Sequence, residues 1–167
     1  MFADEARFGR MNRPRPCWAA AGIRPKVASQ LIREYIYLYG AVTPKDGSCV
    51  YLIMPTSNTA CFQAFLDMLS RKFASQDILL VLDGAPNHRS GQLVAPDNIS
   101  LLFLPPYSPE LNPVENLWHY LRCHYLSNRA YNNYDELFEA GTDAYRRLTP
   151  DLIRSVCACP YLKRRAD

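Results

Sequence analysis

The length, composition and charge of this chain limit the kind of protein it can be. Its 167 residues suit one domain, because a chain of about 150 residues buries roughly 70% of its unfolded surface. With 49% hydrophobic and 21% charged residues, the composition excludes intrinsic disorder, and no apolar run approaches the ~20 residues that span a bilayer. No basic-then-apolar signal segment opens the sequence, so a soluble intracellular protein is predicted.

The first half of the chain is expected to begin with strands. Residues 2–8 alternate partly and are a candidate strand, and residues 9–30 are rich in glycine and proline, which is typical of loops. Tyr35–Tyr39 and Val50–Met54 are rich in aromatic and β-branched residues. The turn signal at Lys45–Ser48 lies between them, so the two segments predict a β-hairpin.

A helix and two further strands are expected next. Ser57 or Asn58 can cap the helix, and its apolar residues recur at the spacing of one helical face. These residues are Phe62, Phe65, Leu66, Leu69 and Phe73. The continuous apolar runs at 78–82 and 99–104 then predict two buried parallel strands.

The last third is expected to be helical. Asn112-Pro113 opens a helix, with proline at the first helical position. Its apolar face consists of Val114, Leu117, Trp118, Leu121 and Tyr125. A further helix covers residues 134–147, and a short one follows Pro150. This order predicts an α/β fold: a mixed sheet, with an antiparallel hairpin and parallel strands, flanked by helices on both faces. Such cover would explain why the later strands are apolar throughout.

Cysteines and basic residues leave several interpretations open. Cys49 and Cys61 lie in or beside apolar segments, and Cys157 and Cys159 lack a second pair at zinc spacing, so reduced structural thiols are expected. Residues 1–33 carry seven basic residues, which form either a phosphate-facing surface or a solvated loop. These are Arg7, Arg10, Arg13, Arg15, Arg24, Lys26 and Arg33. The basic end Lys163–Arg165 either contacts DNA or is a solvated tail.

Asp83 is a candidate site residue because it follows an apolar strand. In open α/β sheets, ligands bind outside the carboxyl ends of the strands. Asn87 and His88 follow within five residues, so a carboxylate, an amide and an imidazole lie close together in the sequence. An ordinary Asp-Gly turn at Asp83-Gly84 is the alternative.

Glu115 also has two interpretations. Asn112 precedes it by three residues, which matches the capping-box pattern at a helix start. However, Glu115, His119 and Arg122 fall at i, i+4 and i+7 and therefore share one polar face. Such a face could hold a metal ion and touch a phosphate, or it could be solvated.

Asp4 and Glu5 are adjacent, so on a strand they point to opposite faces and only one can reach a shared site. If Phe2 and Phe8 pack inward, Asp4 lies on their face, but this alternation does not select the residue by itself. Three carboxylates from two strands and a helix would suit two hard cations such as Mg²⁺, which prefer oxygen ligands.

Three motifs resemble those of DDE transposases of the IS630/Tc1/mariner superfamily. They are FADEARFG at 2–9, LVLDGAPNH at 80–88 and LPPYSPELNPVENLW at 104–118, of which the last is the most distinctive. The stretch at 18–25 is similar to the family's Trp…Gly-x-x-Pro segment. The resemblance covers about residues 2–150, which is nearly the whole chain.

The resemblance implies a ribonuclease-H-like fold, two Mg²⁺ (or Mn²⁺) ions and cut-and-paste transposition of an insertion sequence. It assigns catalysis and metal binding to Asp4, Asp83 and Glu115, with Asp4 bridging both ions. Water and then a DNA 3′-hydroxyl would be the nucleophiles. His88, His119 and Arg122 are candidates to support the metal ligands or to contact DNA phosphates.

The implied partners are the transposon ends, the target DNA and a second copy of the chain, in a bacterial, nucleoid-associated, cytoplasmic setting. Residues 1–167 are expected to be one catalytic domain without the family's N-terminal helix-turn-helix region. That region would be separate or joined by frameshifting. The 31 residues between Asp83 and Glu115 are slightly few for the family. A catalytically silent transposase remnant that binds DNA or a partner, and another ribonuclease-H-like nuclease such as a Holliday-junction resolvase, are the alternatives.

Overall fold

The computed structural model describes residues 1–11 and 14–162 of the chain. Arg13 and the basic end Lys163–Arg165 lie outside the described residues, so what the sequence predicts for them stays a prediction.

A five-stranded mixed sheet organises the domain, in the order β3-β2-β1-β4-β5. The central strand β1 (Phe2–Gly9) pairs antiparallel with β2 (Tyr35–Thr43), which pairs antiparallel with β3 (Ser48–Met54). On its other side β1 pairs parallel with β4 (Ile78–Leu82), and β4 pairs parallel with β5 (Ile99–Phe103). The predicted combination of a hairpin and parallel strands is confirmed.

Strand β2 continues beyond its predicted end at Tyr39, through Gly40, Ala41 and Val42. Ala41 and Val42 are fully buried, and Gly40 pairs with Asp4 of β1. A glycine usually weakens a strand, but here the ring of Trp118 occupies the space that a side chain would take. Tertiary packing therefore explains why the strand is longer than its sequence predicts.

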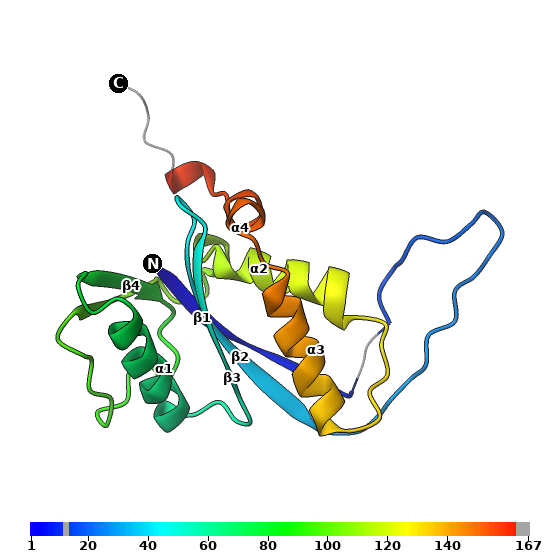
Figure 1. Ribbon diagram of the computed structural model, residues 1–167, viewed down its shortest axis with the longest axis horizontal. Helices are drawn as coiled ribbons and strands as arrows, with labels where there is room; N and C mark the ends of the chain where they lie inside the picture. The colour runs from blue at the N-terminus through cyan, green and yellow to red at the C-terminus, as the bar shows by residue number, and fades with distance from the viewer. Residues whose placement is uncertain (12–13, 163–167) are drawn as a thin grey trace.

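Helices cover both faces of the sheet (Figure 1). Helix α1 (Thr59–Lys72) is capped by Asn58 and packs on one face. The other face carries α2 (Val114–Leu121), a π-helical turn (Arg122–Leu126), α3 (Tyr134–Arg146) and α4 (Pro150–Val156). Short 3₁₀ turns occupy Pro109–Leu111 and Pro160–Leu162. Each face has its own hydrophobic core, so β1 and β2 lie between two packed layers.

The expectation that both faces of the later strands are covered is wrong for β4 and β5. Leu79 of β4 is 54% exposed and Leu102 of β5 is 49% exposed. Both strands bury their other face against the core that contains α1. The helices of the opposite layer contact β1, β2 and β3, which leaves the edge of the sheet open on that side.

The segment between β1 and β2 projects away from the sheet (Figure 1), and Trp18 within it is fully exposed. Its basic residues divide into two kinds. Arg24, Lys26 and Arg33 are exposed, whereas Arg10 is buried and donates hydrogen bonds to the carbonyl oxygens of residues 131 and 132. No helix in the described part of the chain combines the length and apolar character needed to cross a membrane.

Candidate active site

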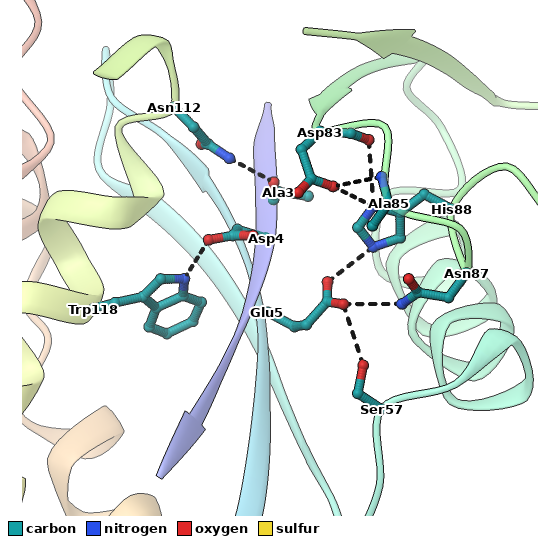
Figure 2. A network of polar contacts seen from close by, with 10 residues as sticks. All are labelled: Ala3, Asp4, Glu5, Ser57, Asp83, Ala85, Asn87, His88, Asn112 and Trp118. Atoms are coloured by element: carbon teal, nitrogen blue, oxygen red, sulfur yellow. Dashed lines mark hydrogen bonds and ion pairs between the residues drawn. The ribbon is translucent and has the colours of Figure 1, made fainter. Parts of the chain in front are cut away.

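Asp4 lies near the start of β1 on the face that α2 covers. Its Oδ2 accepts a hydrogen bond of 2.8 Å from the indole Nε1 of Trp118 (Figure 2). Trp118 was expected only as part of the apolar face of its helix, and its ring is indeed buried. The indole therefore both packs in the core and fixes the orientation of a carboxylate.

Asn112 fastens the start of α2 to the same strand. Its Nδ2 donates to the carbonyl oxygen of Ala3 at 2.9 Å (Figure 2). Its Oδ1 accepts from the backbone N–H of Val114 at 3.2 Å. The side chain is buried, so both polar ends must find partners within the protein. These bonds bring Glu115, one residue after Val114, to the strand that carries Asp4.

Asp83 follows β4 and is held by His88. Its Oδ1 lies 2.7 Å from Nδ1 of His88 and accepts from the backbone N–H of Ala85 at 3.1 Å. The other ring nitrogen, Nε2, lies 2.8 Å from Oε2 of Glu5, and Oε1 of Glu5 accepts from Ser57 and Asn87. Figure 2 shows His88 between the two carboxylates. Glu5 thus supports Asp83 through an imidazole, a role that the sequence did not indicate.

The two carboxylates keep His88 charged. Burial lowers the pKa of His88, but its hydrogen bonds to Asp83 and Glu5 outweigh burial and raise the pKa to about 9. The hydrogen bond from His88 also lowers the pKa of Asp83. Burial raises the pKa of Glu5, yet the hydrogen bonds from His88, Asn87 and Ser57 leave it below its ordinary value. A doubly protonated ring that donates to both carboxylates explains all three shifts.

Glu115 lies in the first turn of α2 but does not cap it. The backbone N–H of Asn112 donates to Pro109 and not to the Glu115 side chain, so the capping-box interpretation is wrong. Within the part of the chain that the structure describes, the Glu115 carboxylate has no hydrogen-bond or ion-pair partner. It is therefore available to a ligand.

Asp4, Asp83 and Glu115 all line one pocket of about 560 Å³. Burial, followed by the like charge of Glu115, raises the pKa of Asp4 to about 7, against the hydrogen bond from Trp118. Three carboxylate donors and an accumulated negative charge fit a hard divalent cation, which prefers oxygen ligands. Among the described residues, however, no three His, Cys, Asp or Glu side chains are grouped closely enough to hold a metal ion.

The other predicted residues are placed differently. His88 contacts Asp83 directly, as described. His119 does not line the pocket, and its Nε2 lies 3.5 Å from the sulfur of Cys123. Arg122 lies beyond the end of α2, with its guanidinium 4.9 Å from the centre of the Phe8 ring, and lines a second pocket. Glu115 and Arg122, which share one helix face in the sequence pattern, therefore line two different pockets.

Two pocket residues were not singled out from the sequence as functional. The guanidinium of Arg89 lies 4.6 Å from the centre of the Phe103 ring and lines the pocket beside Asp83. Tyr107, also in the lining, has a left-handed backbone with φ of 57° and a fully exposed ring. Such a conformation is uncommon outside glycine, asparagine and aspartate. The motif around Tyr107 indicated this region, but not the orientation of the ring.

Comparisons with known proteins agree with this geometry. The sequence model of the DDE superfamily endonuclease family matches residues 1–138. The chain is 40% identical over 115 residues to protein y4pE/y4sA of Sinorhizobium fredii, an alignment that covers 68% of this chain and 85% of that protein. It is 28% identical over 171 residues to the transposable element Tc3 transposase of Caenorhabditis elegans, covering 93% of this chain and 51% of the relative.

Solved structures of the Mos1 transposase share the fold. A pre-cleavage Mos1 transpososome superposes with a TM-score of 0.70 at 17% identity, covering 93% of this chain and 51% of the Mos1 chain. The Mos1 mariner paired-end complex with Mn gives a TM-score of 0.69, covering 93% and 50% of the two chains. The fold is therefore ribonuclease-H-like, and the chain spans about half the length of Tc3 and Mos1 transposases. This protein belongs to the DDE superfamily endonuclease family.

Proposed function

We propose that this domain cuts and joins DNA strands in transposition, with divalent cations held by Asp4, Asp83 and Glu115. The observation that carries the proposal is that carboxylates from β1, from the end of β4 and from α2 line one pocket. Bound Mg²⁺ or Mn²⁺ would supply charge neutralisation at the reacting phosphate and activation of the attacking hydroxyl. Mos1 mariner paired-end complexes have been solved with Mn and with Mg, which supports the choice of metal.

The protein's own residues prepare this pocket. Trp118 orients Asp4, and His88 orients Asp83 while keeping it ionised. Glu115 has no hydrogen-bond or ion-pair partner in the described part of the chain, which leaves its carboxylate available to a cation in the pocket. Arg89 in the lining provides a positive charge for a phosphate oxygen. In-line attack by water, and then by a DNA 3′-hydroxyl, breaks one phosphorus–oxygen bond as another forms.

The proposal extends to partners. Mos1 structures are described as a transpososome and as paired-end complexes, which supports an assembly of two or more copies on DNA. We propose that cut-and-paste movement of an insertion sequence also requires a DNA-binding region additional to this domain, either fused to it or on a separate chain. That region would recognise the transposon ends.

A metal-dependent nicking assay on supercoiled DNA tests the catalytic proposal. The wild-type chain should nick with Mg²⁺ or Mn²⁺ and not with EDTA, and Asp83→Asn should lose at least about a hundredfold in rate. Asp77→Asn, at an exposed aspartate outside the pocket, is the matched control and should nick like wild type. Cleavage that persists without metal or in Asp83→Asn would contradict the proposal.

A catalytically silent, DNA-binding domain is the second candidate. It is favoured by the lack of a group of three His, Cys, Asp or Glu side chains at metal-binding spacing within the described residues. Isothermal titration with Mg²⁺ or Mn²⁺ separates the two. An enzyme should bind metal in wild type and not in Asp83→Asn, whereas a silent domain should show no heat that depends on Asp83.

A further inference from the structure

A second pocket, of about 410 Å³, lies at the far ends of β1 and of the helix that begins with α2. Three arginines line it, namely Arg7 on β1, Arg15 in the projecting segment and Arg122 in the π-helical turn. We call it the arginine pocket. Nothing in the catalytic proposal uses it.

The pocket is held in shape by aromatic and backbone contacts. The guanidinium of Arg7 lies 4.5 Å from the centre of the Tyr35 ring, and that of Arg122 lies 4.9 Å from the centre of the Phe8 ring. Contacts of this kind orient a guanidinium while leaving its N–H edge available.

Asn128 holds Arg15 at the pocket although Arg15 belongs to the projecting segment. The Arg15 backbone N–H donates to Oδ1 of Asn128 at 2.9 Å, and the Arg15 carbonyl accepts from Nδ2 of Asn128 at 2.9 Å. Asn128 itself has a left-handed φ of 58°, which asparagine tolerates better than most residues. The three positive charges are therefore brought together by defined contacts between distant parts of the chain.

The charge of the arginine pocket is only partly offset by the protein, through the charge of Glu115 acting on Arg122. Among the described residues, none that lines it is acidic, and none of the three arginines forms an ion pair. Burial, and then the like charge of Arg15, lowers the pKa of Arg122. An anion with several oxygen acceptors would relieve this repulsion, and guanidinium forks match phosphate oxygens in geometry.

We propose that the arginine pocket binds a phosphodiester group of the same DNA strand whose scissile phosphate lies in the catalytic pocket. The choice of DNA as the ligand of this pocket rests on the proposed function. Two contacts support the alignment: Trp118 touches Asp4 at one end of the strand–helix pair, and Arg122 touches Phe8 at the other. A DNA strand that runs along this strand–helix pair would therefore reach both pockets.

The spacing of the pockets predicts which phosphate is bound. Four strand residues from Asp4 to Phe8 span about 13 Å, and seven helical residues from Glu115 to Arg122 span about 10 Å. Neighbouring phosphates of one strand lie about 6–7 Å apart in space, because the strand winds around the duplex while it rises about 3.4 Å per nucleotide. The arginine pocket should thus take the phosphate roughly two nucleotides from the scissile one.

The test measures binding of the full 167-residue chain to a short fluorescein-labelled DNA duplex of mixed sequence by anisotropy, in EDTA, between about 50 and 200 mM salt. Arg122→Gln and Arg7→Gln should each weaken binding about three- to tenfold and reduce the slope of log K against log salt by about 1. Arg71→Gln, at an exposed arginine on α1, removes the same charge elsewhere and should leave the slope unchanged. Thermal unfolding of each variant checks that the fold is retained.

Several outcomes would overturn the inference. Equal slopes for Arg122→Gln, Arg7→Gln and wild type would show that the pocket makes no phosphate contact. A loss as large in Arg71→Gln would show that only net charge matters. Inorganic phosphate that binds wild type but not Arg122→Gln, while both bind the duplex equally, would identify a free-phosphate site instead.

A second measurement tests the position. On a duplex that wild type nicks, ethylation of the phosphate about two nucleotides from the nick should slow wild type and leave Arg122→Gln unaffected. Interference at other phosphates only would contradict the alignment. Because the binding test contains no divalent metal, it gives an answer even where the catalytic proposal fails.

Discussion

The indole nitrogen of Trp118 donates a 2.8 Å hydrogen bond to Asp4, and this bond joins the helix that carries Glu115 to the strand that carries Asp4. The same contact sets the protonation of the carboxylate, because the hydrogen bond lowers the pKa of Asp4 while burial and Glu115 raise it. The position and the charge of Asp4, a proposed metal ligand, thus depend on Trp118, a residue of the hydrophobic core.

Trp118→Phe should separate these two effects. Phenylalanine keeps one aromatic ring at this buried position but has no donor, so the pKa of Asp4 should rise above about 7. Nicking, which on our proposal needs the ionised carboxylate, should fall about tenfold near neutral pH and recover at higher pH. Trp18→Phe makes the same change at an exposed tryptophan and should not alter the pH–rate profile. An unchanged profile in Trp118→Phe would show that the hydrogen bond does not tune Asp4.

Asp4→Asn should stabilise the metal-free protein at high pH. The pKa of Asp4 is about 7 in the fold, against 3.8 for an ordinary aspartate, so the folded state binds an extra proton between these values. Stability should therefore fall as pH rises from about 4 to 7, by at most about 4 kcal/mol.

Urea unfolding in EDTA at about pH 5 and about pH 8 measures this effect. Asp4→Asn removes the titration, so it should exceed wild type by a clearly smaller margin at the lower pH than at the higher one. Asp77→Asn, at an exposed aspartate, should follow wild type at both. If wild type is as stable at the higher pH as Asp4→Asn, Asp4 is not destabilised by its surroundings.

His88→Gln should remove a different pH dependence. The pKa of His88 is raised from 6.5 to about 9, so its ion pairs stabilise the fold fully below about 6.5 and lose this contribution as pH rises through about 9. The loss in wild type should approach about 3 kcal/mol, measured by urea unfolding in EDTA. His124→Gln, at an exposed histidine, should retain it. A wild-type stability that is flat across this window would mean that His88 is neutral in the fold.

The sequence predicts most of the fold because its patterns are local. The apolar face from Phe62 to Phe73 and the apolar run at 78–82 produce the expected α1 and β4. Exposure of Leu79 was not predictable, since it depends on how far helices from the other layer extend over the sheet.

The same distinction applies to the site. The motifs indicated Asp4, Asp83 and Glu115, and all three line one pocket, although their roles remain predictions. The alternation of side chains along β1 predicts that Asp4 and Glu5 point to opposite faces of the sheet. It does not predict that His88 contacts both Glu5 and Asp83. That contact joins residues more than eighty positions apart, and only the paired strands bring them together.

Gly40→Ala should displace Trp118 and, with it, Asp4. A Cβ atom at Gly40 would lie 2.7 Å from Cη2 of the Trp118 ring, which is closer than real contacts allow. The ring is buried and held by its hydrogen bond to Asp4, so it has little room to move. Overpacking of this kind costs about 1–3 kcal/mol, and the pH–rate profile should shift in the same direction as in Trp118→Phe.

A double-mutant cycle makes this prediction specific. Phenylalanine lacks the outer ring that carries Cη2, so Gly40→Ala should cost clearly less in a Trp118→Phe background than in wild type, with a coupling of about 0.5–3 kcal/mol in urea unfolding. Gly91→Ala is the control, because a Cβ atom there meets nothing within 4 Å. Additive costs would mean that Gly40→Ala acts through β2 alone and that Trp118 does not transmit the change to Asp4.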